Sequence, residues 1–494
     1  MTPTTRRLLH ASHAWAGAVF GLLLFIVCLS GVWAVADAHL RYWEAGARRL
    51  TPPAMVDIDQ VLAAVRAQAP LEGRSISITL PTALHPVVTV GSGPAGRGGA
   101  PQRMVLDAAT ARTLDDAWGG AAMAPIVTTL HKNLYAGFPG RIAVSLLGVA
   151  LMVLLLGGIV LHTRRWRDWT ALRLGKGWRV AVLDLHKLLG LWLLPVLLLI
   201  AGTGIFSGLG ALGTMALSPL AYAGGMREAM AELTGGPPTR ASGVSAALPP
   251  LQPLLDAQRL RDPGLHVETL TLAHAGDAEA RLTLAGTRAG LLSTAVFERV
   301  HYRVRDGLLL REDSVRGRGG WLRAFAAVQP LHYAQYGGGW GLALHLLGGL
   351  GAAALAATGS LLWLGRRSAQ GSPGWARRCV RGGGAGLVVA CAALLLAAAA
   401  GLAAAALPWL FWGGWALATA VLALAPRPVL AAAWAAVLAG GLLLGAVGLD
   451  LLRSLAQPLA VAAPALRVDA FLLGAAAVLL AWGLRFLFRF KDFP

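Results

Sequence analysis

Long apolar stretches separated by polar segments dominate this sequence and predict its fold class. Eight of these stretches approach the length of about 20 residues that an α-helix needs to cross the hydrocarbon core of a bilayer. We therefore predict a polytopic α-helical membrane protein with about eight transmembrane helices. The stretches lie at about residues 14–36, 142–161, 188–210, 342–364, 383–405, 408–425, 429–449 and 470–488.

Composition agrees with this prediction and excludes the soluble globular class. Hydrophobic residues make up 56% of the 494 residues and charged residues only 14%, whereas soluble domains carry about 25% charged residues. The first apolar stretch is longer than the core of a typical signal peptide, and no clear small-x-small cleavage site precedes "DAHLRYWE". We interpret it as a retained helix.

Two long polar segments, residues 37–125 and 211–330, have the pattern of small α+β modules. In the first, "VDIDQVLAAVRAQAP" has the period of a helix, and "SISITL", "PVVTV" and "RMVLDAATARTL" alternate as strands do. The second offers "HVETLTLA", "EARLTLAG", "AVFERVHYRV" and "GLLLRED" as strands. The Gly- and Pro-rich runs "GSGPAGRGGAP" and "TGGPPTRASG" predict flexible connectors.

The positive charge follows membrane topology. The formal net charge is +19, but the two polar segments hold nearly equal numbers of basic and acidic residues. The excess gathers at Arg6 and Arg7 and in residues 164–179, 366–381 and 485–491. By the positive-inside rule these segments are cytoplasmic, so both termini are expected to be cytoplasmic and both modules periplasmic or extracellular. Topology explains the charge, and we expect the lipid bilayer and no nucleic acid as a partner.

The first four predicted helices contain an internal repeat. At an offset of 201 residues "LHKNLYAGFPGRIAVSLLGVALMVLLLGGIVLHTRR" aligns without a gap on "LHYAQYGGGWGLALHLLGGLGAAALAATGSLLWLGR", and at an offset of 173 "HAWAG" and "LSG" align on "HKLLG" and "GTG". The repeat is a tandem duplication with parallel copies, related by an axis along the membrane normal. The alignment pairs His131 with His332, His13 with His186, Gly31 with Gly204, Gly158 with Gly359 and Ser30 with Thr203.

These patterns together predict the organisation of the whole chain. Each copy of the repeat is a helix, an exported module and a returning helix. The expected order is a first helix (1–36), a first exported module (37–125), a second helix (126–163), a cytoplasmic hinge (164–185), a third helix (186–210), a second exported module (211–330), a fourth helix (331–365), a cytoplasmic loop (366–382) and four C-terminal helices with a basic tail (383–494).

Several motifs in the repeat resemble those of the PepSY-associated transmembrane family. They are a helix that begins His-x-Trp-x-Gly and ends Ser-Gly, "GIVLHTRRWRDW", "LDLHKLLGLWLLP" and "QPLHYAQYGG". The resemblance covers about residues 1–367, and it implies that the two exported modules are PepSY-like domains. Members of this family are similar to iron-regulated inner-membrane proteins and ferric-siderophore reductases. In those proteins transmembrane histidines hold b-type haem, so the resemblance implies a haem-dependent oxidoreductase.

The repeat offers histidine pairs that suit haem ligation. Neutral imidazoles from two facing helices are suitable axial ligands for a haem that passes electrons. We expect one haem b between His13 and His186 and a second between His131 and His332, which gives a two-step electron path across the membrane. A histidine at a helix end is also a common interfacial residue, which is the alternative interpretation of each one taken alone.

The second pair is expected to lie far from the centre of the membrane. His131 precedes the apolar run by eleven residues, which is about 16 Å along a helix. A haem on His131 and His332 would then lie near or above the outer edge of the membrane. The equal depth of the two histidines fits a shared haem site, and it equally fits an exposed contact with a metal or a siderophore.

Three further histidines are alternates, and several other residues have possible supporting roles. His162 belongs to the family motif, His345 is thirteen residues after His332 and about 140° around a straight helix, and His39 is near the outer end of the first helix. We expect Trp15 and Trp192 to flank the haems and Asp184 to orient a ligand or to favour a helix N-terminus. Asp168 and Lys176 are expected to be ordinary polar residues of the hinge. The histidines of the two modules are expected to be solvated; they are His85, His266, His274 and His301.

The sequence has no recognisable nucleotide-binding or hydrolase motif, so the electrons must come from membrane quinol or a cytoplasmic reductase. The expected acceptor is a ferric siderophore or another iron chelate held by the exported modules. The competing hypothesis is a non-enzymatic protein, a siderophore or metal uptake accessory or a sensor, in which the modules bind a ligand and the histidines are structural.

Overall fold

The computed structural model describes residues 2–68, 70–94, 102–115, 121–162, 169–226, 228–229, 241–367 and 374–489. These residues form two compact units. The membrane unit contains residues 1–47, 122–210 and 332–494, and the sheet unit contains residues 48–121 and 211–331. Asp168 and most of the two predicted connectors lie outside the described residues.

Eight helices in the described part of the chain are long and apolar enough to cross a membrane, which confirms the predicted fold class. The protein is therefore a multi-pass membrane protein. The spans are Pro3–Val35, Gly137–Leu161, Leu194–Ala221, Gly338–Gly365, Arg377–Ala399, Leu407–Leu424, Pro428–Ser454 and Leu459–Phe488.

The repeat forms the first part of the membrane unit. Helix α1 (Pro3–Val35) packs against α12 (Gly338–Arg367) and α5 (Gly137–Leu161), and α5 packs against α7 (Leu194–Ile205). Gly349 allows α12 to approach α1 closely, because a Cβ built on it would lie 2.9 Å from a methyl group of Val32 in α1. Small residues at helix crossings are the usual basis of close packing within membranes.

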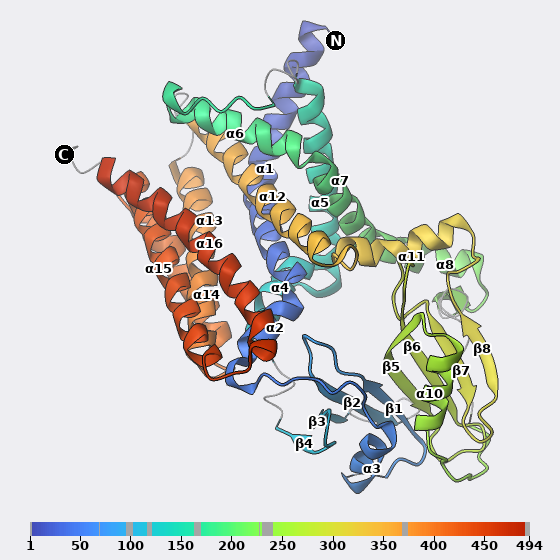
Figure 1. Ribbon diagram of the computed structural model, residues 1–494. Coiled ribbons are helices and arrows are strands. Elements are labelled where there is room, and N and C mark those ends of the chain that lie inside the picture. The colour runs from blue at the N-terminus through green and yellow to red at the C-terminus, as the bar shows by residue number, and fades with distance from the viewer. Residues whose placement is uncertain are drawn as a thin grey trace. The chain divides into compact units, whose positions relative to one another are not determined.

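The third span differs from the predicted continuous helix. Helix α6 (Trp178–Trp192) ends before Pro195, which occupies the first turn of α7. Proline suits a first helical turn but cannot donate the hydrogen bond that would continue the preceding helix. The two helices meet at an angle in Figure 1. His186 therefore lies in a separate short helix rather than at the start of a straight span.

The C-terminal helices form a second bundle within the membrane unit. Helix α13 (Gly374–Ala399) packs against α14 (Leu407–Leu424) and α15 (Pro428–Ser454), and α15 packs against α16 (Leu459–Arg489) (Figure 1).

Helix α2 (Asp37–Ala45) fastens this bundle to the end of α1. Trp43 is 1% exposed, and its indole N–H donates to Asp469 Oδ1 over 2.8 Å. The hydroxyl of Tyr42 donates to the carbonyl of Val461 over 2.8 Å, and the side-chain amide of Gln457 donates to the carbonyl of Gly46 over 2.9 Å. Buried polar groups with partners specify one arrangement of the two segments.

The sheet unit is built on one antiparallel sheet of eight strands (Figure 1). Among the described residues each module supplies four strands and one helix that packs on the sheet, so the α+β pattern predicted for both modules is found. The helix of the second module, α10, was not predicted. The elements are α3 (Ile58–Gln68), β1 (Arg74–Thr79), β2 (Val87–Pro94), β3 (Gln102–Asp107), β4 (Thr113–Leu114), α10 (Gln252–Arg261), β5 (Leu265–Ala273), β6 (Arg281–Arg288), β7 (Arg299–Arg303) and β8 (Leu309–Asp313).

Both modules share the sheet, which the sequence pattern did not predict. The strand order is β4-β3-β2-β1-β5-β6-β7-β8, so β1 of the first module pairs with β5 of the second. Ser77 lies opposite Thr271 at the centre of this pairing, and Ile78 lies opposite Leu270. One face of the sheet packs its isoleucine, valine and leucine side chains against α3 and α10, and this forms the core of the unit.

A buried ion network joins the strands of the second module. Arg288 is 3% exposed and its guanidinium contacts three carboxylates, those of Glu298 at 2.9 Å, Glu312 at 2.7 Å and Asp262. Glu298 is fully buried and also accepts from the hydroxyl of Ser293. Because a buried charge is costly without partners, the network fixes the positions of β6, β7 and β8 relative to α10.

Candidate functional site: two histidine pairs

A helix break brings His131 onto α1. Helix α4 (Met123–Asn133) ends with Leu134 and Tyr135 in the left-handed region, and α5 begins only at Gly137. The chain therefore reverses before the apolar run. The imidazole of His131 lies beside Gly31, and its Nδ1 is 2.8 Å from the carbonyl oxygen of Val27.

The second copy of the repeat breaks in the same place. Helix α11 (Gly320–His332) ends at His332, and Ala334, Gly337 and Gly338 have positive φ before α12 begins. Nδ1 of His332 is 3.0 Å from Oγ1 of Thr203 in α7. The assumption of a continuous helix is thus wrong for both copies, so the distance of 16 Å and the angle of 140° calculated from it do not apply.

The two histidines brought in by these breaks lie close together. The ring centres of His131 and His332 are 6.3 Å apart, and their planes differ by 19°. This is the second pair named in the sequence prediction. His131 contacts α1 at Val27 and Gly31, which belong to the membrane span itself, so the pair lies within the span of α1 rather than beyond its end.

The first predicted pair is also formed. His13 in α1 and His186 in α6 have ring centres 6.5 Å apart, with planes at 84°. Nδ1 of His186 is 3.0 Å from Oγ1 of Thr358 in α12. Nδ1 of His13 is buried and has no hydrogen-bond partner among the residues that the structure describes.

Four glycines make room for the four imidazoles, and they occupy equivalent positions in the two copies of the repeat. A Cβ built on Gly31 would lie 2.9 Å from Cε1 of His131, and one on Gly204 would lie 3.0 Å from Cε1 of His332. The same holds for the first pair. A Cβ built on Gly359 would lie 3.2 Å from Cε1 of His186, and one on Gly158 would lie 3.5 Å from Cε1 of His13. These glycines are the paired positions of the sequence alignment, so each histidine of one helix rests on a glycine of its neighbour.

Hydrogen bonds to Nδ1 define which ring nitrogen carries the proton in three of the four histidines. A carbonyl oxygen only accepts, so His131 donates from Nδ1 to Val27. The hydroxyl of Thr203 donates to the carbonyl of Leu199 over 2.7 Å, and the hydroxyl of Thr358 donates to the carbonyl of Ala354 over 2.7 Å. Each threonine oxygen therefore accepts from Nδ1 of its histidine. Nε2 is left unprotonated, which is the form that binds a metal.

The spacing of the rings fits two imidazoles on opposite sides of one metal ion. A metal–imidazole bond is about 2 Å and the ring centre lies about 1 Å beyond the nitrogen, which gives ring centres about 6 Å apart. The observed separations are 6.3 and 6.5 Å. Within the described part of the chain no group of three or more His, Cys, Asp or Glu side chains could hold a metal. Two-histidine ligation of a haem needs only such a pair, so these residues fit the group.

The remaining predicted histidines take part in neither pair. His162 ends α5, and His39 lies in α2, where burial and the neighbouring charge of Arg467 lower its pKa. His345 in α12 is 1% exposed, its Nδ1 is 3.1 Å from the carbonyl of Gly341, and its ring packs edge to face on Tyr336 at 5.6 Å.

The predicted supporting residues have other contacts. Trp15 packs on Trp363 with ring centres 5.9 Å apart, and Trp192, which is 63% exposed, donates to the carbonyl of Trp169 over 2.8 Å. Asp184 binds the guanidinium of Arg173 at 2.7 and 2.9 Å rather than a histidine. These hydrogen bonds hold the pKa of the Asp184 carboxyl below its ordinary value.

Thr203 and Thr358 are the site residues that sequence reasoning missed. A signal was available for Thr203, because the repeat aligns it with Ser30, whose hydroxyl donates to the carbonyl of Ile26 over 2.7 Å. Thr358 aligns with Gly157, so the repeat gives no matching polar group there. That difference explains why Nδ1 of His13 lacks the partner that His186 has.

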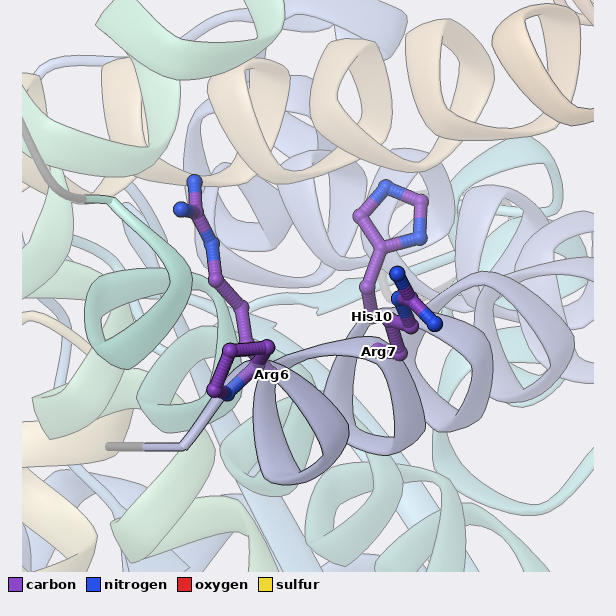
Figure 2. Close-up of a pocket in the computed structure, with 4 residues that line it drawn as sticks. Arg6, Arg7 and His10 are labelled. Carbon is purple, nitrogen blue, oxygen red and sulfur yellow. The ribbon is translucent and has the colours of Figure 1, made fainter.

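A basic depression lies at the start of α1, in the turns that precede His13. Figure 2 shows Arg6, Arg7 and His10 projecting from the first turns of the helix, and Pro3 completes the lining. All four residues are exposed. Charged side chains at the end of a transmembrane helix are explained by contact with lipid headgroups and water.

Comparison with known proteins agrees with this architecture. A model of the PepSY-associated transmembrane region matches residues 11–366, which is the part that contains the repeat, both histidine pairs and the sheet unit. An uncharacterized protein of Pseudomonas aeruginosa is 51% identical over 250 residues, which are 49% of this chain and 64% of that protein. The chain thus spans less than two thirds of that relative. The family match covers most of the sequence, and the chain therefore belongs to the PepSY-associated transmembrane family.

Proposed function

We propose that each histidine pair binds one haem b and that the protein carries electrons across the bacterial inner membrane to an iron(III) chelate, such as a ferric siderophore, in the periplasm. The observation that carries this proposal is the repeat-related spacing of the rings, 6.5 Å for His13 and His186 and 6.3 Å for His131 and His332. Bound haem would supply a one-electron carrier at each pair.

The residues of the chain have distinct roles in this proposal. The imidazoles would hold the haem iron through Nε2, while Val27, Thr203 and Thr358 fix the protonated nitrogen and the ring orientation. The apolar helices exclude water, which protects the carrier from side reactions.

The direction of transfer in the proposal follows from the distribution of charge. By the positive-inside rule the basic segments favour cytoplasmic termini, and the pair at the start of α1 would then be nearer to that side. Membrane quinol or a cytoplasmic reductase is the proposed donor. The proposed donor and acceptor then meet opposite ends of the membrane unit.

Haem content tests the proposal directly. Protein purified from haem-replete cells should contain two b-type haems per chain with a reduced Soret and α-band after dithionite. His13→Ala and His186→Ala should each remove one haem, and His131→Ala and His332→Ala should each remove the other. His266→Ala, which removes an exposed histidine from β5, is the matched control and should leave two haems.

The outcomes separate the two hypotheses. A colourless protein from such cells would refute the reductase and favour a non-enzymatic accessory or sensor. If haem is present and none of the four variants loses any, the pairing is wrong although the protein binds haem.

A further inference from the structure

The sheet unit has a polar face opposite its apolar core. Directly paired residues of an antiparallel sheet point to the same side, so the registers define which side chains share this face. One row crosses the sheet from β3 to β8 and consists of Arg103, Gly91, Ser77, Thr271, Thr283, His301 and Arg311 in spatial order. Its centre is made of small or hydroxyl side chains, and cationic side chains stand at both ends.

The second module adds further cations to this face. Arg281 lies directly opposite Arg303 in the pairing of β6 with β7, and Arg299 lies two residues before His301. Like charges that face each other across a strand pair are destabilising. An arrangement of this kind is expected where a bound anion offsets the repulsion.

Most acids near these cations already have partners. Asp313 accepts from Nε2 of His301 over 3.0 Å and from Nε of Arg311 over 2.6 Å, and Asp306 accepts from Arg303 over 2.6 Å. Arg281 forms no ion pair among the residues that the structure describes, and its Nε is buried without a hydrogen-bond partner there. A buried guanidinium N–H without an acceptor is costly, and a ligand oxygen would satisfy it.

We propose that this face binds a carboxylate-bearing anion, with Arg281 and Arg299 as the charged contacts and Thr271 as a hydroxyl contact. A guanidinium presents its N–H groups in a planar fork that matches a carboxylate, and the row of short side chains leaves a flat surface for a ligand. The identification of this anion as the iron(III) chelate rests on the proposed function. The site itself rests only on the residues of the sheet unit.

Binding of gallium(III) citrate to the full-length protein tests the site. Gallium(III) has a size and charge close to those of iron(III) but does not accept an electron under these conditions, so binding is measured apart from reduction. Titration calorimetry should show saturable binding that weakens as salt is added. Arg281→Gln and Arg299→Gln should each weaken binding about tenfold or more, because each removes a charged hydrogen bond.

Matched variants separate a specific site from a general charge effect. Arg112→Gln removes the same charge from an exposed turn beside β4 and should bind as the unmodified protein does. Arg281→Lys keeps the charge but loses the fork, so it should bind with intermediate affinity. Citrate alone and a cationic gallium(III) trihydroxamate are the ligand controls, and the cationic complex should bind weakly and without dependence on Arg281.

Several results would overturn this site. They are no saturable binding to the folded protein, equal binding by Arg281→Gln, Arg299→Gln and Arg112→Gln, or equal binding of the cationic complex. The proposed electron transfer is tested separately from the anion site. A haem-free protein that still binds gallium(III) citrate through Arg281 would contradict the reductase proposal and support the anion site.

Discussion

Thr358 accepts a hydrogen bond from Nδ1 of His186 at 3.0 Å, while the position that corresponds to Thr358 in the other copy of the repeat is Gly157. His186 is thereby held in one tautomer and orientation, and His13 is not. The two histidines of the first pair are therefore unequal, although the repeat makes them equivalent in sequence.

This difference predicts the effect of removing the threonine hydroxyl. Thr358→Val should weaken haem binding at the first pair about tenfold or more, because a ligand that loses the partner of its other nitrogen is less well oriented. Thr358→Ser should restore it. Haem occupancy and the reduction potential of the affected haem are the measurements, and Thr203→Val should act in the same way on the second pair.

The converse substitution supplies the missing partner. A Cβ at Gly157 would lie 3.7 Å from Nδ1 of His13, which is ordinary contact. Gly157→Ser should therefore be accommodated and should raise the affinity of the first pair for haem. A loss of haem from this variant would show that Nδ1 of His13 is not the nitrogen that needs a partner.

The glycines beside the imidazoles should be intolerant of a methyl group. Gly204→Ala places a carbon 3.0 Å from Cε1 of His332, and Gly31→Ala places one 2.9 Å from Cε1 of His131. Both should shift the spectrum of the haem at the second pair or remove it, because close contacts displace the ring. Gly17→Ala is the control, since nothing lies within 4 Å of its added Cβ. Equal spectra for all three variants would exclude a role for the glycines.

The sheet unit should lose stability in mild acid through His301. Burial lowers the pKa of His301, and the charges of Arg281 and Arg299 add to this effect while Asp313 opposes it. The folded unit then binds fewer protons than the unfolded chain below about pH 6.5. The stabilisation is therefore complete above that pH and is lost as pH falls through the lowered pKa.

Thermal unfolding of the purified protein between about pH 7.5 and about pH 5 measures this effect. The His301→Gln variant should lose part of the decline in melting temperature. His266→Gln, a change at an exposed histidine of β5, should keep the full decline. An identical decline in all three proteins would exclude His301 as its source.

The attachment of the C-terminal bundle should depend on Trp43. Trp43→Phe removes the indole N–H that Asp469 accepts and leaves a buried carboxylate with one partner fewer. The expected cost is about 1–3 kcal/mol in the free energy of unfolding. Trp409→Phe, at a position that is 81% exposed, should cost much less.

A double substitution checks that the Trp43 effect is pairwise. In Trp43→Phe combined with Asp469→Leu, the loss should be smaller than the sum of the two single losses, because both partners are gone. Additive losses would indicate that Trp43 and Asp469 act independently. Chemical unfolding followed by tryptophan fluorescence gives the free energies.

Much of the fold followed from the sequence because apolar length and repeated motifs are local signals. The eight spans were predicted, and the strands of the modules follow their alternating patterns. The break at Leu134 and Tyr135 was not predictable in this way, because neither residue has the conformational preference of glycine for positive φ. Local hydrogen bonds hold that turn, since Asn133 Oδ1 accepts from the backbone N–H of Tyr135 over 3.0 Å and the Tyr135 hydroxyl donates to the carbonyl of Ile126 over 2.7 Å.

The candidate site was predictable only in outline. The repeat alignment singled out four histidines as two pairs, and the structure brings the members of each pair together. Their hydrogen-bond partners were missed because Thr358 is 172 residues from His186 and has no polar counterpart in the other copy. The shared sheet was missed for a related reason, since the pairing of β1 with β5 joins segments that are about 190 residues apart in the sequence.

The pairing of β1 with β5 also describes how the duplication was accommodated. Ile76 lies opposite Leu272 and Ile78 opposite Leu270, so a local two-fold axis passes through Ser77 and Thr271. A chain with a single copy would complete the same sheet by pairing its β1 with that of a second molecule, as a symmetric homodimer does. Because both copies stand in one chain, the two halves of this interface need not be identical. Thr358, which the repeat aligns with Gly157, is one position where the copies differ.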